Sequence, residues 1–139
     1  FEYVVQTRPF VVRRTVRWAE CDPAGVVYTG NFTDYLLSAV LQYLRHLRGV
    51  PVAVAPEVDL PCRHMHLDFH ASLYPDDVVD IEVSIAQVRE HTFDVAANAR
   101  FPDGRPAFSG VFTPICIQTG VRTHKVPLPA ALRQVLQSA

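Results

Sequence analysis

The longest amphipathic helical pattern of this chain is NFTDYLLSAVLQYLRHLRG, residues 31–49, and we expect the rest of the fold to be arranged around it. Its apolar side chains recur at the spacing i, i+3, i+4, i+7, which is typical of one face of an α-helix. They are Phe32, Tyr35, Leu36, Ala39, Val40, Tyr43, Leu44 and Leu47. We therefore predict a largely buried helix over residues 32–48, with Asn31 as its N-cap and with Gly49 and Pro51 as its stop signal.

The sequence on both sides of this helix is rich in β-branched and aromatic residues, as strands are. One strand is predicted before the helix, over residues 10–21. Four more are predicted after it, over residues 63–74, 78–89, 92–101 and 105–118. The short turns between these four require antiparallel pairing, so we expect a meander. Leu132, Val135 and Leu136 indicate a short last helix over residues 129–137.

These elements predict an α+β fold, in which a curved antiparallel sheet of about five strands wraps around one long central helix. The uncovered sheet edges favour a homodimer or a dimer of dimers. At 139 residues the chain fits a single domain over residues 1–139.

Composition excludes several classes of protein. The formal net charge of -1 gives no electrostatic footprint for nucleic acid. The three cysteines, Cys21, Cys62 and Cys116, form no CxxC pair, so we expect free thiols in a reducing compartment. No apolar run approaches the ~20 residues of a membrane span, and no signal peptide is recognisable. We expect a cytoplasmic protein that binds no membrane.

The segment ECDPAGVVYTGN, residues 20–31, lies where the first strand has ended and the helix has not yet begun. A carboxylate such as Asp22 can act as a general base for water or as a nucleophile. Amides at the start of a helix have no intrahelical partners and lie at the positive end of the helix dipole. Pro23 fixes its own φ, and Gly25 permits a close approach of a ligand. The alternative is structural, because Asp before Pro commonly starts a turn.

The longer segment WAECDPAGVVYTGNFTDYL, residues 18–36, resembles the start of acyl-CoA thioesterases of the 4-hydroxybenzoyl-CoA thioesterase type, with the pattern D-P-x-G-x-V-Y. The resemblance implies the hotdog fold, a curved antiparallel sheet around one helix, paired into dimers. It also implies that Asp22 carries the chemistry of thioester hydrolysis and that the backbone amide of Thr29 polarises the thioester carbonyl. Coenzyme A would be part of the substrate, and no dissociable cofactor is expected.

We expect the substrate to be bound by residues around this carboxylate and by two histidines of the following strand. The candidates are Pro23, Gly25, Val27, Tyr28, Asn31, Phe32, His64 and His66. Four arginines, Arg63, Arg89, Arg100 and Arg122, are candidates for the phosphates of coenzyme A, and the sequence singles out none of them.

The positions His64, His66, Asp68 and His70 alternate and would share one face of a regular strand. Three imidazoles and a carboxylate are zinc ligands, but neighbours on one face lie about 6.5 to 7 Å apart and converge poorly on one ion. We therefore predict no metal site. The opposite face, with Met65 among its apolar residues, should cover the helix.

Two other functions stay open at this point. The first is a non-catalytic module that binds acyl-CoA or an acyl-carrier thioester on the same fold. The second is hydration of an enoyl thioester, for which a histidine beside the aspartate would be expected, and residues 20–31 contain none. Cys21 is a further candidate nucleophile. The sequence does not distinguish aromatic from aliphatic acyl groups, coenzyme A from carrier-protein thioesters, or a nucleophilic from a general-base role of Asp22.

Overall fold

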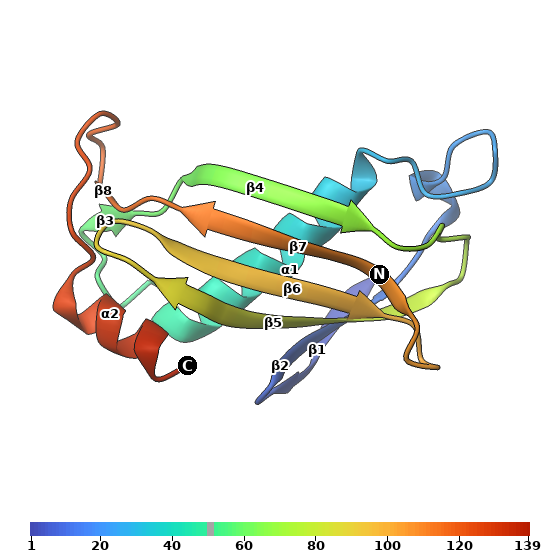
Figure 1. Ribbon diagram of the computed structural model, residues 1–139, viewed down its shortest axis with the longest axis horizontal. Coiled ribbons are helices and arrows are strands. Elements are labelled where there is room, and N and C mark those ends of the chain that lie inside the picture. The colour runs from blue at the N-terminus through green and yellow to red at the C-terminus, as the bar shows by residue number, and fades with distance from the viewer. Residues whose placement is uncertain (50–51) are drawn as a thin grey trace.

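The computed structural model describes residues 1–49 and 52–139, so Pro51, part of the predicted stop signal, lies outside the described residues. The main sheet has six strands in the order β1-β2-β5-β6-β7-β4, and a second sheet pairs β3 with β8 (Figure 1). The elements are β1 (Glu2–Thr7), β2 (Phe10–Thr15), a 3₁₀ helix (Trp18–Glu20), α1 (Asn31–Arg48), β3 (Val58–Asp59), β4 (Cys62–Phe69), β5 (Val78–Val88), β6 (Phe93–Arg100), β7 (Pro106–Pro114), β8 (Ile117–Gln118) and α2 (Ala130–Gln137).

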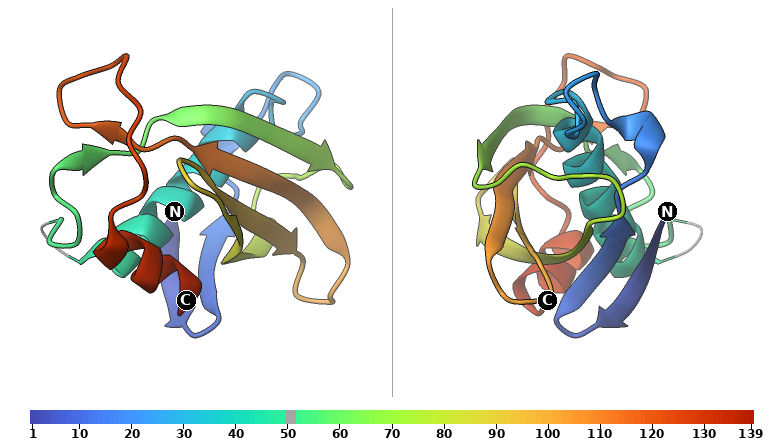
Figure 2. Two further views of the ribbon diagram at one scale, coloured as in Figure 1. Left: turned by 60° about the vertical axis from the view of Figure 1, so that its left-hand side comes forward. Right: turned by 90° about the vertical axis from the view of Figure 1, so that its right-hand side faces the viewer.

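All neighbouring strands of the main sheet are antiparallel, and the sheet curves around α1 (Figure 2). The predicted α+β arrangement is therefore confirmed, with six strands in the main sheet where about five were expected. The short last helix is also confirmed as α2, which buries Leu132 and Leu136. Neither α1 nor α2 is long and apolar enough to cross a membrane.

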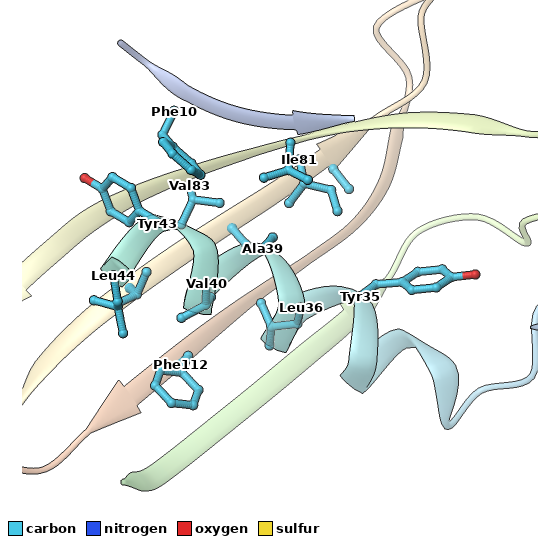
Figure 3. Packing of buried hydrophobic residues seen from close by; sticks show 14 of the residues in the cluster. Phe10, Tyr35, Leu36, Ala39, Val40, Tyr43, Leu44, Ile81, Val83 and Phe112 are labelled. Atoms are coloured by element: carbon cyan, nitrogen blue, oxygen red, sulfur yellow. The ribbon is translucent and has the colours of Figure 1, made fainter. Parts of the chain in front are cut away.

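Helix α1 buries the face that its periodicity predicts. Seven of its residues are buried, and Figure 3 shows several of them turned toward the strands. They are Phe32, Tyr35, Leu36, Ala39, Val40, Tyr43 and Leu44. Each leucine- or valine-sized side chain removed from water in this way stabilises the fold by about 1.5 to 3 kcal/mol. Gly49 ends the helix as predicted, with a φ of 88° and an N–H that donates to Arg45 O at 2.9 Å.

The predicted N-cap is wrong. Asn31 is the first helical residue, Gly30 precedes it, and no side chain of the described residues caps the helix. The side chain of Asn31 points instead to the segment before the helix, where its Nδ2 donates to Glu20 O at 2.7 Å. That bond fixes the path of the chain between the 3₁₀ helix and α1.

The predicted first strand, residues 10–21, is also too long. It ends at Thr15 and is preceded by β1, with which it forms a hairpin. The sequence Arg8-Pro9 between two β-branched runs is the turn signal of this hairpin.

The predicted four-strand meander holds for β5, β6 and β7 but not for β4. β4 pairs with β7 at the far edge of the sheet, and β2 takes the place beside β5. The cause is segment 70–77, which crosses the start of α1 and does not form a tight hairpin. Its residue Leu73 is fully buried and its carbonyl accepts from Val27 N–H at 2.8 Å, while Asp76 N–H donates to Val16 O at 2.9 Å. This crossing brings the end of β4 beside the loop that contains Asp22.

Candidate active site

A short loop between the 3₁₀ helix and α1 positions Asp22. The amide of Asp22 donates to Val26 O at 2.8 Å, and the amide of Gly25 donates to Asp22 O at 2.9 Å. Pro23 therefore occupies the second position of a β-turn, where its fixed φ is favoured. Gly25 has a φ of 85°, in the left-handed region that favours glycine. Proline and glycine thus give the loop its shape.

The carboxylate of Asp22 is oriented by this turn. Its Oδ1 accepts from Ala24 N–H at 2.9 Å, which is an Asx turn. Its Oδ2 has no hydrogen-bond partner among residues 1–49 and 52–139. The structural and the functional interpretation of Asp22 are therefore compatible, because one oxygen holds the turn while the other is available to a ligand.

Asp22 lines a hollow of about 410 Å³ that we call the Asp22 hollow. Three segments meet there: the loop, the start of α1 and the chain just after β4, which lie at the same end of the molecule in Figure 1. The lining residues are Asp22, Val26, Val27, Thr29, Phe32, Phe69, His70, Ala71 and Ser72. Apolar side chains with a few convergent polar groups are typical of a small-molecule site.

Two backbone amides at the start of α1 are available for a ligand. Tyr28 N–H donates to Glu20 O at 3.0 Å, and Asn31 N–H donates to Tyr28 O at 2.9 Å. Between them, the amides of Thr29 and Gly30 have no acceptor within the described chain. Thr29 lines the Asp22 hollow. A carboxylate and a helix-terminal N–H donor therefore border one cavity, and the dipole of α1 favours negative charge at that point.

Glu20 anchors the loop from both its main chain and its side chain. Its carbonyl accepts from Tyr28 N–H and from Asn31 Nδ2, and its carboxylate accepts from Arg17 N–H at 2.8 Å and from the Arg14 guanidinium. Burial disfavours the charged carboxylate, but these two donors outweigh it and lower the pKa of Glu20 below its ordinary value. Arg14 also pairs with Glu2 at 2.8 Å, so three charges share the partly buried network.

The structure brings together only some of the predicted substrate-binding residues. Val27, Thr29 and Phe32 line the Asp22 hollow with Asp22 itself. Pro23 and Gly25 shape the turn without lining the hollow. The side chain of Tyr28 is 59% exposed, and that of Asn31 is bound to Glu20 O.

His64 and His66 lie on β4 but do not line the Asp22 hollow. They border a second hollow on the other side of the sheet from α1, as their exposed positions in the alternation of β4 predict. Met65 and Leu67, on the opposite side of the strand, pack against the core.

The histidine that does line the Asp22 hollow is His70, which the sequence grouped with the outward-facing residues of β4. Its Nε2 and Ser109 Oγ are 2.9 Å apart. Because β4 ends at Phe69, His70 belongs to the connection that passes the loop. The end of a strand followed by small residues was the available signal for this placement.

The three cysteines are free thiols, with Cys62 exposed and Cys116 buried. Partial desolvation and the carboxylates of Glu20 and Asp22 raise the pKa of the Cys21 thiol. A raised pKa leaves less thiolate at neutral pH, which disfavours Cys21 as a nucleophile. Within the described residues, no group of three or more His, Cys, Asp or Glu side chains is placed to hold a metal ion.

A comparison with protein families identifies one match. The family model of the Thioesterase-like superfamily matches residues 16–136, which include the Asp22 loop, α1 and all the strands from β3 onward. One curated relative is a 1,4-dihydroxy-2-naphthoyl-CoA hydrolase of Synechococcus sp. (strain CC9902). It is 25% identical over 136 residues, which cover 92% of this chain and 89% of the relative.

Solved structures share the fold. A protein of the thioesterase superfamily from Jannaschia sp. CCS1 superposes with a TM-score of 0.84 and 22% identity, covering 94% of this chain and 92% of its own. A 4-hydroxybenzoyl CoA thioesterase mutant, solved in complex with 4-hydroxybenzoyl CoA, superposes with a TM-score of 0.79 and 19% identity, covering 91% and 96%. At these identities the similarity shows a common architecture.

Proposed function

The chain belongs to the thioesterase-like superfamily, and from this premise we propose that it hydrolyses an acyl-CoA thioester to a carboxylic acid and a free thiol. The membership confirms the resemblance to hotdog-fold acyl-CoA thioesterases and the reaction class, thioester hydrolysis. The residues assigned below are the finer part of the proposal. Asp22 is the nucleophile or general base, and the amide of Thr29 is the oxyanion donor.

One observation carries this assignment: the Asp22 carboxylate and the unpaired amide of Thr29 border the same hollow. As a general base, Asp22 takes a proton from water while the water oxygen attacks the carbonyl carbon. As a nucleophile, it attacks the carbon itself and forms a mixed anhydride that water then hydrolyses. In both routes the carbonyl oxygen becomes negative and the C–S bond breaks. The amide of Thr29 and the dipole of α1 stabilise that oxygen.

His70 adds a third polar group to the hollow. The contact with Ser109 Oγ fixes the orientation of its ring, and its Nδ1 has no partner among the described residues. We assign Nδ1 to the substrate or to the water that attacks it.

The apolar part of the hollow favours an aromatic acyl group. Phe32 and Phe69 both line it, with ring centroids 4.9 Å apart in a T-shaped arrangement. A flat ring makes favourable edge or offset contacts with such a pair. The relatives named for 1,4-dihydroxy-2-naphthoyl-CoA and 4-hydroxybenzoyl CoA agree with this choice.

The predicted dimer belongs to the proposal as well. β4 lies at an edge of the sheet, and within the described chain its outer side has no partner strand. The Asp22 hollow opens near the end of β4, so a second copy seated along this edge would help to enclose the substrate. Dimer and dimer of dimers are both consistent with this placement.

The experiment is thiol release from a panel of acyl-CoAs that differ in chain length and aromaticity. We expect release above the uncatalysed rate, with benzoyl-type substrates preferred over linear acyl groups of similar size. Preference for linear chains would overturn the aromatic assignment. If acyl-CoA raises the Tm of the protein but no thiol is released across the panel, the protein is a module that binds acyl-CoA without hydrolysing it.

A further inference from the structure

The second hollow, on the outer face of the sheet, has a volume of about 570 Å³ and gathers four basic side chains from two separate segments. Three come from β4 and one follows the end of β5. We call it the arginine hollow. It is lined by Arg63, His64, His66, Arg89, Thr92, Asp94, Val111 and Thr113.

A β-bulge places two consecutive residues of β4 at this hollow. Cys62 is paired with Pro114 and His64 with Thr113, so the register shifts between them and Arg63 has no partner on β7. In a regular strand Arg63 and His64 would face opposite sides of the sheet. The bulge breaks this alternation, and both residues line the hollow.

The charges in the arginine hollow do not cancel. Both terminal nitrogens of Arg89 bind the carboxylate of Asp94, at 2.9 and 2.7 Å, and Thr113 Oγ1 also donates to it at 2.7 Å. This pair is internally neutral. Arg63, in contrast, has no ion pair or hydrogen bond from its guanidinium within residues 1–49 and 52–139. The hollow thus holds one uncompensated guanidinium, with its donors free, beside two imidazoles.

β4 runs from the arginine hollow to the Asp22 hollow. His66 borders the first and His70 the second. They are four residues apart along the chain, about 13 Å at a rise of ~3.3 Å per residue, and Arg63 lies seven residues before His70, about 23 Å. An elongated ligand that lies along β4 can therefore reach both hollows.

Resting on the proposed function, we propose that the arginine hollow binds the phosphate groups of coenzyme A while the thioester lies beside Asp22. Coenzyme A has its phosphates at one end and its sulfur at the other, joined by the extended pantetheine arm. The guanidinium of Arg63 is the principal ligand, because planar paired donors match phosphate oxygens. His64 and His66 supply further N–H donors, and the Arg89–Asp94 pair forms a fixed wall.

The test compares two thioesters of the same acyl group, one on coenzyme A and one on pantetheine, which has no phosphates at that end. For Arg63→Gln we expect the ratio of KM for acyl-CoA to KM for acyl-pantetheine to rise about tenfold over the wild-type ratio, as for a lost charged hydrogen bond. Arg8→Gln removes an equal charge from the exposed β1–β2 turn, which lines neither hollow, and should leave the ratio at its wild-type value. An unchanged ratio in Arg63→Gln, or an equal rise in Arg8→Gln, overturns the assignment.

A binding measurement separates this inference from the proposed function. Desulfo-coenzyme A and inorganic phosphate are titrated into wild type and Arg63→Gln by calorimetry, with far-UV circular dichroism to check that both are folded. We expect the affinity for desulfo-coenzyme A to fall about tenfold in the variant. If desulfo-coenzyme A binds wild type no better than phosphate does, the site takes free phosphate and the assignment is wrong. If wild type binds desulfo-coenzyme A as expected but releases no thiol from acyl-CoA, the proposed hydrolysis is refuted and the phosphate site is not.

Discussion

Asn31 Nδ2 lies 2.7 Å from the main-chain oxygen of Glu20, and this hydrogen bond joins the first residue of α1 to the residue two positions before Asp22. The same oxygen also accepts the amide of Tyr28. The carboxylate of Asp22 and the amide of Thr29, which has no acceptor within the described residues, thereby belong to one short loop closed by these two bonds. Catalysis by such a pair depends on its separation, so the bonds that close the loop are part of the site.

Asn31→Ala should reduce kcat more than it raises KM, because it loosens the loop without removing a group that touches the substrate. The lost hydrogen bond should also lower the free energy of unfolding by about 1 kcal/mol. Thermal unfolding and steady-state thiol release measure both effects. Asn98→Ala, at an exposed position of β6, is the matched control and should change neither. An unaltered kcat in Asn31→Ala would show that the side chain of Asn31 does not position the loop for the reaction.

Asp22→Asn should lower the rate of thiol release by roughly 10² to 10⁴ fold, the usual contribution of an acid–base group. Asparagine keeps an oxygen that can accept from Ala24 N–H, so the turn and the Tm should be preserved. Asp22→Ala loses this bond too and should be less stable by about 0.5 to 2 kcal/mol. A wild-type rate in Asp22→Asn would show that the carboxylate serves the turn alone.

Gly25→Ala and Gly104→Ala form a matched pair for the shape of the loop. Both glycines have a positive φ, 85° and 90°, and in both cases an added Cβ meets nothing within 4 Å. Each substitution should therefore cost about 1 to 2 kcal/mol in the free energy of unfolding, through backbone conformation alone. Gly104 lies in the β6–β7 turn, away from the Asp22 hollow, so only Gly25→Ala should also reduce thiol release. Equal activities at equal stability losses would contradict a special role for the loop.

The lowered pKa of Glu20 makes the stability of the fold depend on pH in the acid range. Its pKa in the folded protein is lowered, so it binds a proton more readily when the chain is unfolded. Its stabilisation is therefore complete above its unfolded pKa of about 4.3 and is lost as the pH falls through the lower folded value. The difference in Tm between wild type and Glu20→Gln should be largest near neutral pH and should shrink below about pH 4. A difference that grows toward acid pH would contradict the sign of this linkage.

Chelation should leave hydrolysis unchanged, since the proposed steps use only a carboxylate, backbone amides and water. The rate of thiol release is compared before and after dialysis against EDTA. A loss that Zn²⁺ or Mg²⁺ restores would show that a metal ion takes part, and the assignment of the Asp22 hollow would have to be revised.

Features that depend on neighbouring residues could be predicted from the sequence, whereas the pairing of distant strands could not. The period of α1 and the turn residues around Asp22 depend on neighbours a few positions away, so they could be identified in the sequence. The partner of β4 could not, because consecutive strands joined by a short segment usually pair with each other. Here Leu73 is buried against the core and carries the chain across the start of α1. His70 was misplaced for another reason: the predicted strand ran to residue 74, whereas β4 ends at Phe69.

The β-bulge of β4 shows a second limit. Strict alternation assigns Arg63 to the face that covers the helix and His64 to the opposite face. The register shift next to Cys62 is set by pairing with β7, and residues 62–64 alone do not predict it. The assembly of the arginine hollow was therefore visible only in the structure.

The Asp22 hollow is built from two stretches of chain that are far apart in sequence. Asp22 and Thr29, the groups proposed to act on the thioester carbonyl, lie within residues 22–29, while His70 and much of the wall around the acyl group come from residues 69–72. A substitution in the second stretch can reshape the wall without disturbing the hydrogen bonds that close the loop. In evolution, such a division lets the choice of acyl group change by mutation at Phe69 while the carboxylate and the amide proposed to act on the thioester are inherited intact.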